Sequence, residues 1–238
     1  AKYIPSNNSR LAFIQGRNDA REDENQSTFQ NNLMDEITLY YMRDLRVREV
    51  YGFLPLLGHG ALIKRSTFIE LGKFPQVVSE DFAFALIAAS KGYDSVHAYD
   101  AKSYETYPYD FGSFIIRIKK FAGGTAEIIK KCLFNFLVSE AKLVEKWDFL
   151  IMLFWYILIP LIVANIFVGA YVTHNYWLNE TPYIHPILPY VYAYLLISIL
   201  TIILSLGRKN FSSAFKFYLW TTSIYSASMP VIAFNFLK

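Results

Sequence analysis

The 238 residues carry 23 Lys and Arg against 20 Asp and Glu, giving a net charge of +3, and 54% of them are hydrophobic. So small a positive excess argues against nucleic acid as a partner, and an aromatic share of 18% exceeds what the core of an ordinary soluble domain uses. Cys132 is the only cysteine, which excludes an internal disulfide and a cysteine zinc site.

The first part of the chain alternates apolar runs with amphipathic ones, which predicts an α/β fold. A strand is expected over 11–15, and the polar stretch 16–25 is expected to be a solvated loop. Residues 29–51 place apolar side chains on one face and charged ones on the other, so they predict a helix. The later predicted elements are a strand ending near Lys64, a helix over 66–72 with a Ser or Thr cap, a helix over 80–91, a strand over 96–99, and a helix over 113–131 interrupted only at Gly123-Gly124.

Ser79 is placed to cap the helix over 80–91. Glu80 and Asp81 would then occupy its first turn, where free amide groups and the helix dipole favour ionised carboxylates. Either is therefore available as a proton acceptor at neutral pH. Acidic residues also occur in first turns for stability alone, so this pattern by itself leaves both interpretations open.

Three charge-free segments follow, each long enough to cross a hydrocarbon core of about 30 Å. They are 149–172, 187–206 and 217–237. The loop 173–186 has no Lys or Arg, whereas 207–216 has three, which places the second loop and residues 1–148 in the cytoplasm. The spans contain no charged residue, which argues against a small ion channel.

Residues 128–148 join the soluble part to the first span. Their apolar side chains fall roughly on one side and their lysines elsewhere, which predicts an amphipathic helix in the headgroup plane. The alternative interpretation is an ordinary helix that packs within the domain.

Six motifs occur in an order that resembles a known family. They are Gly58-His59-Gly60-Ala61-Leu62-Ile63-Lys64-Arg65, Leu71-Gly72-Lys73-Phe74-Pro75, Ser79-Glu80-Asp81, Lys91-Gly92-Tyr93, Glu105 with Pro108, and Arg117 to Thr125. Together they resemble the C-terminal half of a processive family-2 glycosyltransferase such as cellulose, hyaluronan and bacterial β-glucan synthases. The resemblance implies part of a GT-A, Rossmann-related domain over 1–127, followed by the helical transmembrane region 149–238.

The resemblance also implies roles for individual residues. Ser79-Glu80-Asp81 matches the family's T-E-D, which makes Asp81 the general base for the acceptor hydroxyl and Glu80 its supporting neighbour. In the Q-x-x-R-W region, Arg117 replaces Gln, Lys120 replaces Arg and Phe121 replaces Trp. An aromatic face for the acceptor sugar and a charge for the nucleotide diphosphate are kept, but the bidentate guanidinium fork is lost.

The turn Gly58-His59-Gly60 falls where the family has small residues facing the active site. Glycines there let the backbone approach a sugar, and His59 either contacts a substrate or supports the turn. Glu105 and Tyr107 match a segment that borders the acceptor channel, and the sequence gives them no defined role.

A family-2 enzyme binds its donor through an N-terminal half and a D-x-D motif that holds Mg²⁺ or Mn²⁺. Residues 1–5 resemble the stretch directly after D-x-D, so no metal ligand is expected within this chain and the motif is expected to precede Ala1. Either a longer polypeptide or a partner subunit would supply that half.

The sequence therefore predicts a multi-pass membrane enzyme, expected in the plasma membrane, with its catalytic part in the cytoplasm. It would be an inverting hexosyltransferase that takes sugars from a nucleotide-sugar donor of the UDP-sugar kind. The expected acceptor is a growing polysaccharide whose secretion is coupled to synthesis, and membrane lipid is the expected surrounding. The alternatives are a transferase of the same fold with a polyprenyl or lipid acceptor, and a non-catalytic membrane subunit.

Overall fold

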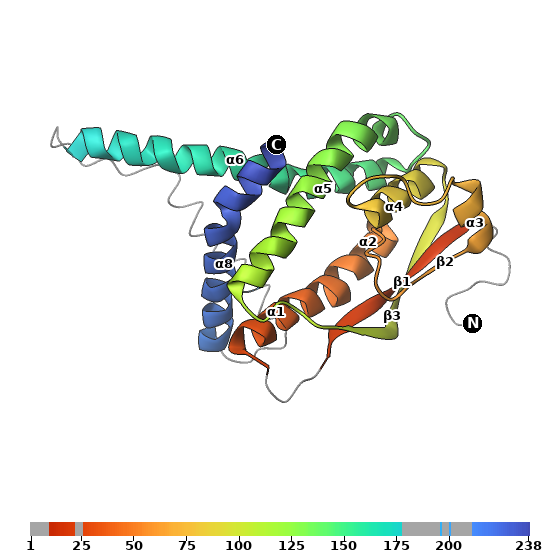
Figure 1. Ribbon diagram of the computed structural model, residues 1–238, viewed down its shortest axis with the longest axis horizontal. Coiled ribbons are helices and arrows are strands. Elements are labelled where there is room, and N and C mark those ends of the chain that lie inside the picture. Colours follow the sequence, from red (N-terminus) through yellow and green to blue (C-terminus); the bar gives the residue numbers. More distant parts are fainter. Residues whose placement is uncertain (1–9, 22–25, 178–195, 197–199, 201–210) are drawn as a thin grey trace.

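The computed structural model describes residues 10–21, 26–177, 196, 200 and 211–238 (Figure 1). Its strands and helices alternate along the soluble part, in agreement with the predicted α/β class. In chain order they are β1 (Leu11–Ala20), α1 (Thr28–Leu39), a π-helical turn (Tyr40–Asp44), α2 (Leu45–Tyr51), β2 (Ala61–Ile63), α3 (Arg65–Glu70), α4 (Glu80–Ser90), β3 (Asp94–Glu105), α5 (Phe111–Leu137), α6 (Leu143–Trp177) and α8 (Phe211–Leu237).

The three strands form one mixed sheet in the order β2-β1-β3. β1 pairs antiparallel with β2 and parallel with β3, and its register with β3 shifts between Gly16 and Arg17. A Cβ on Gly16 would lie 2.6 Å from the Gly60 carbonyl oxygen and 2.8 Å from that of Ala101. The central strand therefore needs glycine at this point, where both neighbouring backbones approach closely.

The loop predicted over 16–25 is wrong as far as Ala20, because β1 continues beside the second half of β3. Two charged side chains of its described part, those of Arg17 and Asp19, have partners within the sheet region. Asp19 lies 2.6 Å from the Arg17 guanidinium and 3.3 Å from Lys102 Nζ. Polar composition here reflects ion pairing across the sheet rather than solvation of a loop.

The helix predicted over 29–51 is confirmed, with a π-helical turn inside it. A capping box begins it, since Ser27 Oγ accepts from the Gln30 N–H and the Gln30 side chain accepts from the Ser27 N–H. At the π-helical turn, the Tyr41 carbonyl oxygen lies 2.9 Å from His97 Nε2. The other ring nitrogen of this buried histidine lies 3.0 Å from the Gln15 carbonyl oxygen, so His97 ties the turn to β1.

The later helices follow the prediction with three differences. The N-cap of α3 is Lys64, which makes no side-chain capping bond, instead of a Ser or Thr. Helix α5 runs without interruption through Gly123-Gly124 to Leu137. The helix expected over 128–148 is divided between α5 and α6 by the turn at 138–142.

Phenylalanine rings dominate the core where α4, α5 and α6 meet. The Phe149 ring centroid lies 5.7 Å from that of Phe53 and 5.1 Å from that of Phe136. Phe149 itself has no exposed surface, and Leu153 one turn later is also buried. The first turns of α6 therefore contribute side chains to the hydrophobic core.

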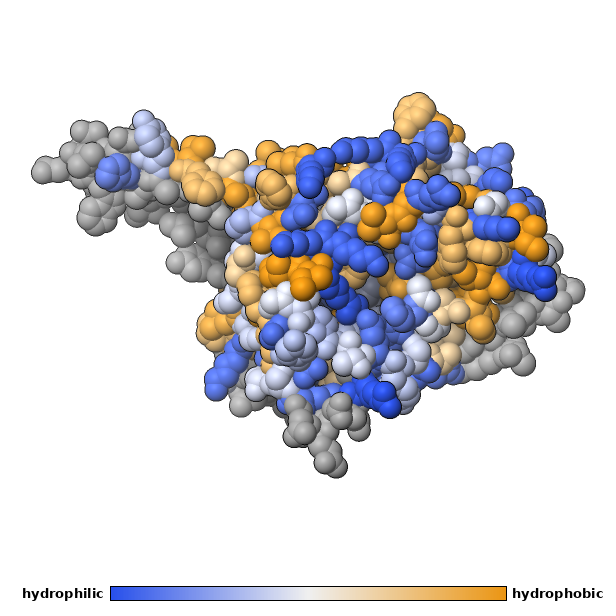
Figure 2. Space-filling model, in the orientation of Figure 1, coloured by the Kyte–Doolittle hydropathy of each residue, from blue (hydrophilic) through white to orange (hydrophobic). Residues whose placement is uncertain are grey.

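Beyond these turns, α6 projects from the body of the molecule (Figure 1). Within the described part of the chain, Leu143–Gly169 is the one helical segment whose length and apolar composition suit a membrane span, and few of its residues are buried. Core helices and signal sequences can meet the same criteria. Figure 2 shows hydrophobic surface where this part leaves the body. Phe154, Ile157 and Leu161 of this helix are exposed.

The structure describes only one of the other two predicted spans. The span predicted over 187–206 lies outside the described residues apart from two isolated positions. The third corresponds to α8, which packs along α5 and α6 and also touches α1. Its residues Phe217, Ile232 and Ala233 are buried by these contacts. The three-span topology stays a prediction.

Candidate functional site

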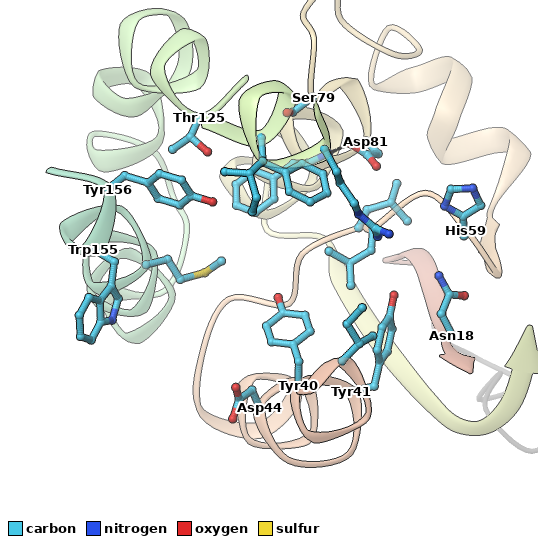
Figure 3. A pocket seen from close by; sticks show the side chains of 18 of the residues that line it. Asn18, Tyr40, Tyr41, Asp44, His59, Ser79, Asp81, Thr125, Trp155 and Tyr156 are labelled. Carbon is cyan, nitrogen blue, oxygen red and sulfur yellow. Dashed lines mark hydrogen bonds between the residues drawn. The ribbon is translucent and has the colours of Figure 1, made fainter. Parts of the chain in front are cut away.

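A cavity of about 580 Å³ lies where the sheet meets the helices, within the size range of ligand sites (Figure 3). Its walls come from β1, β3 and most of the helices. Polar lining residues are Asn18, Asp44, Arg48, His59, Ser79, Asp81, Glu105, Arg117 and Thr125, and aromatic ones are Tyr40, Tyr41, Phe82, Tyr107, Phe114, Phe121, Trp155, Tyr156 and Tyr225. Aromatic faces interleaved with hydroxyl and carboxylate groups suit a ligand with both C–H and hydroxyl surfaces.

Four residues singled out from the sequence meet at this cavity. They are His59, Asp81, Arg117 and Phe121. Glu80 and Lys120 are exposed and do not line it. Gly58 and Gly60 do not line it either, and both have positive φ in the turn that carries His59.

Asp81 stands in the first turn of α4, as expected. Its Oδ1 accepts a 2.8 Å hydrogen bond from the Phe82 N–H. A Cβ on Gly58, whose φ is +82°, would lie 2.8 Å from Oδ2, so glycine leaves room for this carboxylate. No described Lys or Arg forms an ion pair with Asp81. The half-buried carboxylate is thus open to a ligand in the cavity.

Arg117 lies between a carboxylate and two rings. Its Nη1 is 3.3 Å from Glu105 Oε1, and its guanidinium carbon lies 5.7 Å from the Tyr107 ring centroid. The same carbon lies 5.5 Å from the Phe121 ring centroid. The aromatic face that the resemblance assigns to the acceptor sugar is therefore shared with the Arg117 cation.

Sequence reasoning missed Asn18 and gave Glu105 and Tyr107 no role. Asn18 Nδ2 donates to Glu105 Oε2 at 3.4 Å, and Tyr107 Oη donates to the Asn18 carbonyl oxygen at 3.4 Å. Ser103 Oγ also donates to Asn18 Oδ1. Asn18 was overlooked because it fell in a predicted loop, whereas it lies inside β1 and pairs with Ser103 of β3.

Two phenols of the cavity stay protonated at neutral pH. Burial raises the pKa of Tyr40 to about 12 and moves the pKa of Tyr107 further upward from its ordinary value. The Tyr107 hydroxyl donates its hydrogen bond to the Asn18 carbonyl oxygen, whereas the Tyr40 hydroxyl can donate a hydrogen bond to a ligand oxygen.

The cavity has two ends, which Figure 3 shows on opposite sides. Asn18, His59 and Asp81 stand at one end, and Trp155 and Tyr156 of α6 stand at the other. Tyr40 and Tyr41 rise between them from the π-helical turn. The space therefore leads from the candidate base to the helix that leaves the body.

The far end also carries charged groups, and each has a partner. Arg48 Nη1 lies 3.1 Å from Asp148 Oδ2, while the Phe53 N–H donates to the same oxygen at 2.9 Å. Asp44 Oδ1 lies 2.6 Å from Arg43 Nε. Paired charges leave this end near neutrality, which suits uncharged hydroxyl groups better than a phosphate.

The described residues contain no group of three or more His, Cys, Asp or Glu side chains able to hold a metal ion. A hard divalent cation needs several oxygen ligands. The described residues therefore offer no all-protein cage for Mg²⁺ or Mn²⁺, and the metal ligands expected before Ala1 stay a prediction.

A family model described as glycosyl transferase family group 2 matches residues 5–230. The match covers the cavity, all the described helices except the last turns of α8, and the whole sheet. Comparison with curated proteins found no match.

Proposed function

This chain belongs to glycosyl transferase family group 2, and from that membership we propose that Asp81 is the general base that activates the acceptor for sugar transfer. The family uses a nucleotide-sugar donor and a glycan acceptor in general. The observation that carries the proposal is the meeting of Asp81, Arg117 and Phe121 at one cavity.

The proposed reaction is a direct displacement at the anomeric carbon. The acceptor hydroxyl oxygen forms the new glycosidic bond while the bond from that carbon to the diphosphate oxygen breaks, which inverts the configuration. Asp81 takes the hydroxyl proton, and the nucleoside diphosphate leaves with the bonding electrons. A carboxylate needs only to lie within hydrogen-bond reach of the hydroxyl as the bond forms.

The other side chains of the cavity would position the substrates. Arg117 supplies a cation near the reaction centre, with its orientation held by Glu105. Lys120 is exposed, so the proposal gives this task to Arg117. The phenol of Tyr40 would donate to a sugar oxygen, and the ring faces would contact sugar C–H groups.

We extend the proposal to a membrane-embedded enzyme with a cytoplasmic site and a polysaccharide product. Its support is that Trp155 and Tyr156, at the far end of the cavity, belong to the helix that is apolar enough to span a bilayer. A product could leave along that helix. The same exposed apolar helix favours a second candidate, transfer to a polyprenyl or other lipid acceptor whose chain lies beside α6.

The test uses the full-length protein in membranes supplied with labelled nucleotide sugars. Asp81→Asn should lower transfer by about 10²–10⁴-fold, the usual contribution of a positioned base. Glu140→Gln, which neutralises an exposed carboxylate outside the cavity, should leave transfer unchanged. An active Asp81→Asn protein would exclude the proposed base and leave a scaffold role open. If the labelled sugar is recovered in organic solvent instead of in free polymer, the acceptor is a lipid and the second candidate function is correct.

A further inference from the structure

We propose that Gly124 and Glu127 of α5 are positioning residues that set the place of Asp81. The inference rests on the proposed function, because it concerns the geometry of the same base. Both residues contact the segment directly before α4, and α5 also carries Arg117 and Phe121.

The first contact is a close approach that glycine permits without any movement of Ser79. A Cβ on the buried Gly124 would overlap Ser79 Oγ and would lie 3.2 Å from Ser79 Cβ. The neighbouring Gly123 has nothing within 4 Å of its Cβ position. The two adjacent glycines therefore differ in their surroundings: Gly124 lies against Ser79 at the start of α4, whereas Gly123 faces open space.

The second contact is a hydrogen bond one helical turn further along α5. Glu127 Oε2 accepts from the Val78 N–H at 2.7 Å, and Lys131 Nζ donates to Glu127 Oε1 at 2.7 Å. The bonds from Lys131 and from Val78 lower the pKa of this carboxyl, so it is ionised at neutral pH. Glu127 thereby fixes the backbone two residues before the N-terminus of α4.

These contacts explain why the predicted cap is missing. Ser79 occupies the N-cap position of α4, but its side chain makes no capping hydrogen bond and its φ and ψ are −105° and 63°. Its Oγ instead lies against the backbone of α5 at Gly124. The first turn of α4, which bears Asp81, is thus located by α5 rather than by its own cap.

The spacing along α5 links this contact to the reaction centre. Arg117, Phe121 and Gly124 follow one another at i, i+4 and i+7, which places them on one helix face. That face lines the cavity at Arg117 and Phe121 and meets Ser79 at Gly124. One rigid helix therefore fixes the distance between the candidate base and the Arg117 cation.

The principal test compares Gly124→Ala with Gly123→Ala in the full-length protein in membranes. Gly124→Ala should lower kcat on the order of 10²-fold with little change in the donor KM, because a displacement of about 1 Å at a reaction centre has that effect. Gly123→Ala should keep the wild-type kcat. Adding Ser79→Gly to Gly124→Ala removes the overlapping atoms and should restore most of kcat. A merely structural role would change Tm without this split or this rescue.

A second pair of variants covers the case in which Gly124→Ala fails to fold. Glu127→Ala should lower kcat, and Glu127→Gln, whose amide oxygen can still accept from Val78, should restore much of it. Full activity of Gly124→Ala, or of Glu127→Ala, would overturn the inference. The same assay tests the proposed function separately. Loss of activity in Asp81→Asn supports Asp81 as the base whatever the α5 variants do, so failure of the positioning inference can be told apart from failure of the proposed function.

Discussion

Tyr225 donates a 2.6 Å hydrogen bond to Glu36 Oε1, and this bond joins α8 to α1. The second carboxyl oxygen, Oε2, is buried without a hydrogen-bond partner among the described residues. Aromatic contacts surround the pair, with the Phe114 ring 5.7 Å from Tyr225 and the Phe29 ring 5.4 Å from Trp220. Helix α8 therefore closes one side of the cavity through an ionisable contact.

This contact predicts a pH dependence of stability. Burial raises the pKa of Glu36 from 4.5 to about 6, so the folded protein holds a proton that the unfolded chain releases between these values. The contribution of the Glu36 carboxyl to the free energy of unfolding is fully present below pH 4.5 and is lost as the pH rises through about 6. Glu36→Gln should remove this pH dependence, because the amide stays uncharged. One pKa unit corresponds to about 1.4 kcal/mol, so the variant should be more stable than the wild type by roughly 2 kcal/mol at pH 7.5. Tm measured from pH 4.5 to 7.5 checks this, with Glu140→Gln as control; a parallel slope in Glu36→Gln would contradict it.

The Arg117–Glu105 pair predicts non-additive effects of substitution. Arg117→Ala would leave Glu105 without its cation in a largely enclosed site, whereas removing both side chains leaves no unpaired charge. A double-mutant cycle with Glu105→Ala should give a coupling of about 0.5–3 kcal/mol in the free energy of unfolding. The exposed pair Lys142–Asp94, 3.6 Å apart, is the control and should show almost none. Purely additive losses at Arg117 and Glu105 would show that the ion pair has no energetic role.

Substitution of His97, which lies outside the cavity, is expected to lower stability. Both ring nitrogens lie near carbonyl oxygens, those of Gln15 and Tyr41, and His97→Phe removes the ring N–H that serves as donor, at about 1–3 kcal/mol for an unsatisfied group. Chemical denaturation should therefore show a loss of about 1–3 kcal/mol. The exposed His59 offers the matched comparison, and His59→Phe should change stability little. Equal stability of the two variants would mean that His97 does not hold the π-helical turn.

The start of α6 predicts opposite outcomes for two phenylalanines. Phe149→Ala should destabilise the protein by about 3–5 kcal/mol, because its ring is fully buried among other rings. Phe154→Ala, on the exposed side of the same helix, should leave the unfolding free energy nearly unchanged. Thermal unfolding in detergent compares them. A large loss with Phe154→Ala would place the projecting part of α6 inside the packed core.

Much of the fold follows from local patterns in the sequence. Apolar periodicity is enough to predict the helix from 29 to 51. The helix that begins at Glu80 is buried on most of its surface, and it was predicted from the position of Ser79 instead. The second half of β1 escaped prediction because its polar side chains pair with residues of β3 far along the chain, and such pairing leaves no local period. The predicted capping hydrogen bond of Ser79 is absent for a similar reason, because the Ser79 side chain lies against Gly124 of a distant helix.

The candidate site divides in the same way. Asp81 and Arg117 were found through motif order, which gives positions in sequence but no contacts. The ion pair of Arg117 with Glu105 and the bond of Asn18 to Glu105 depend on how β1, β3 and α5 meet, and only the folded chain shows them.

Helix α6 runs from its buried first turns to its projecting end. The Phe149 ring in those first turns lies 6.0 Å from the ring of Phe82, the residue next to Asp81. The helix that leaves the body is therefore anchored against the same turn that carries the candidate base.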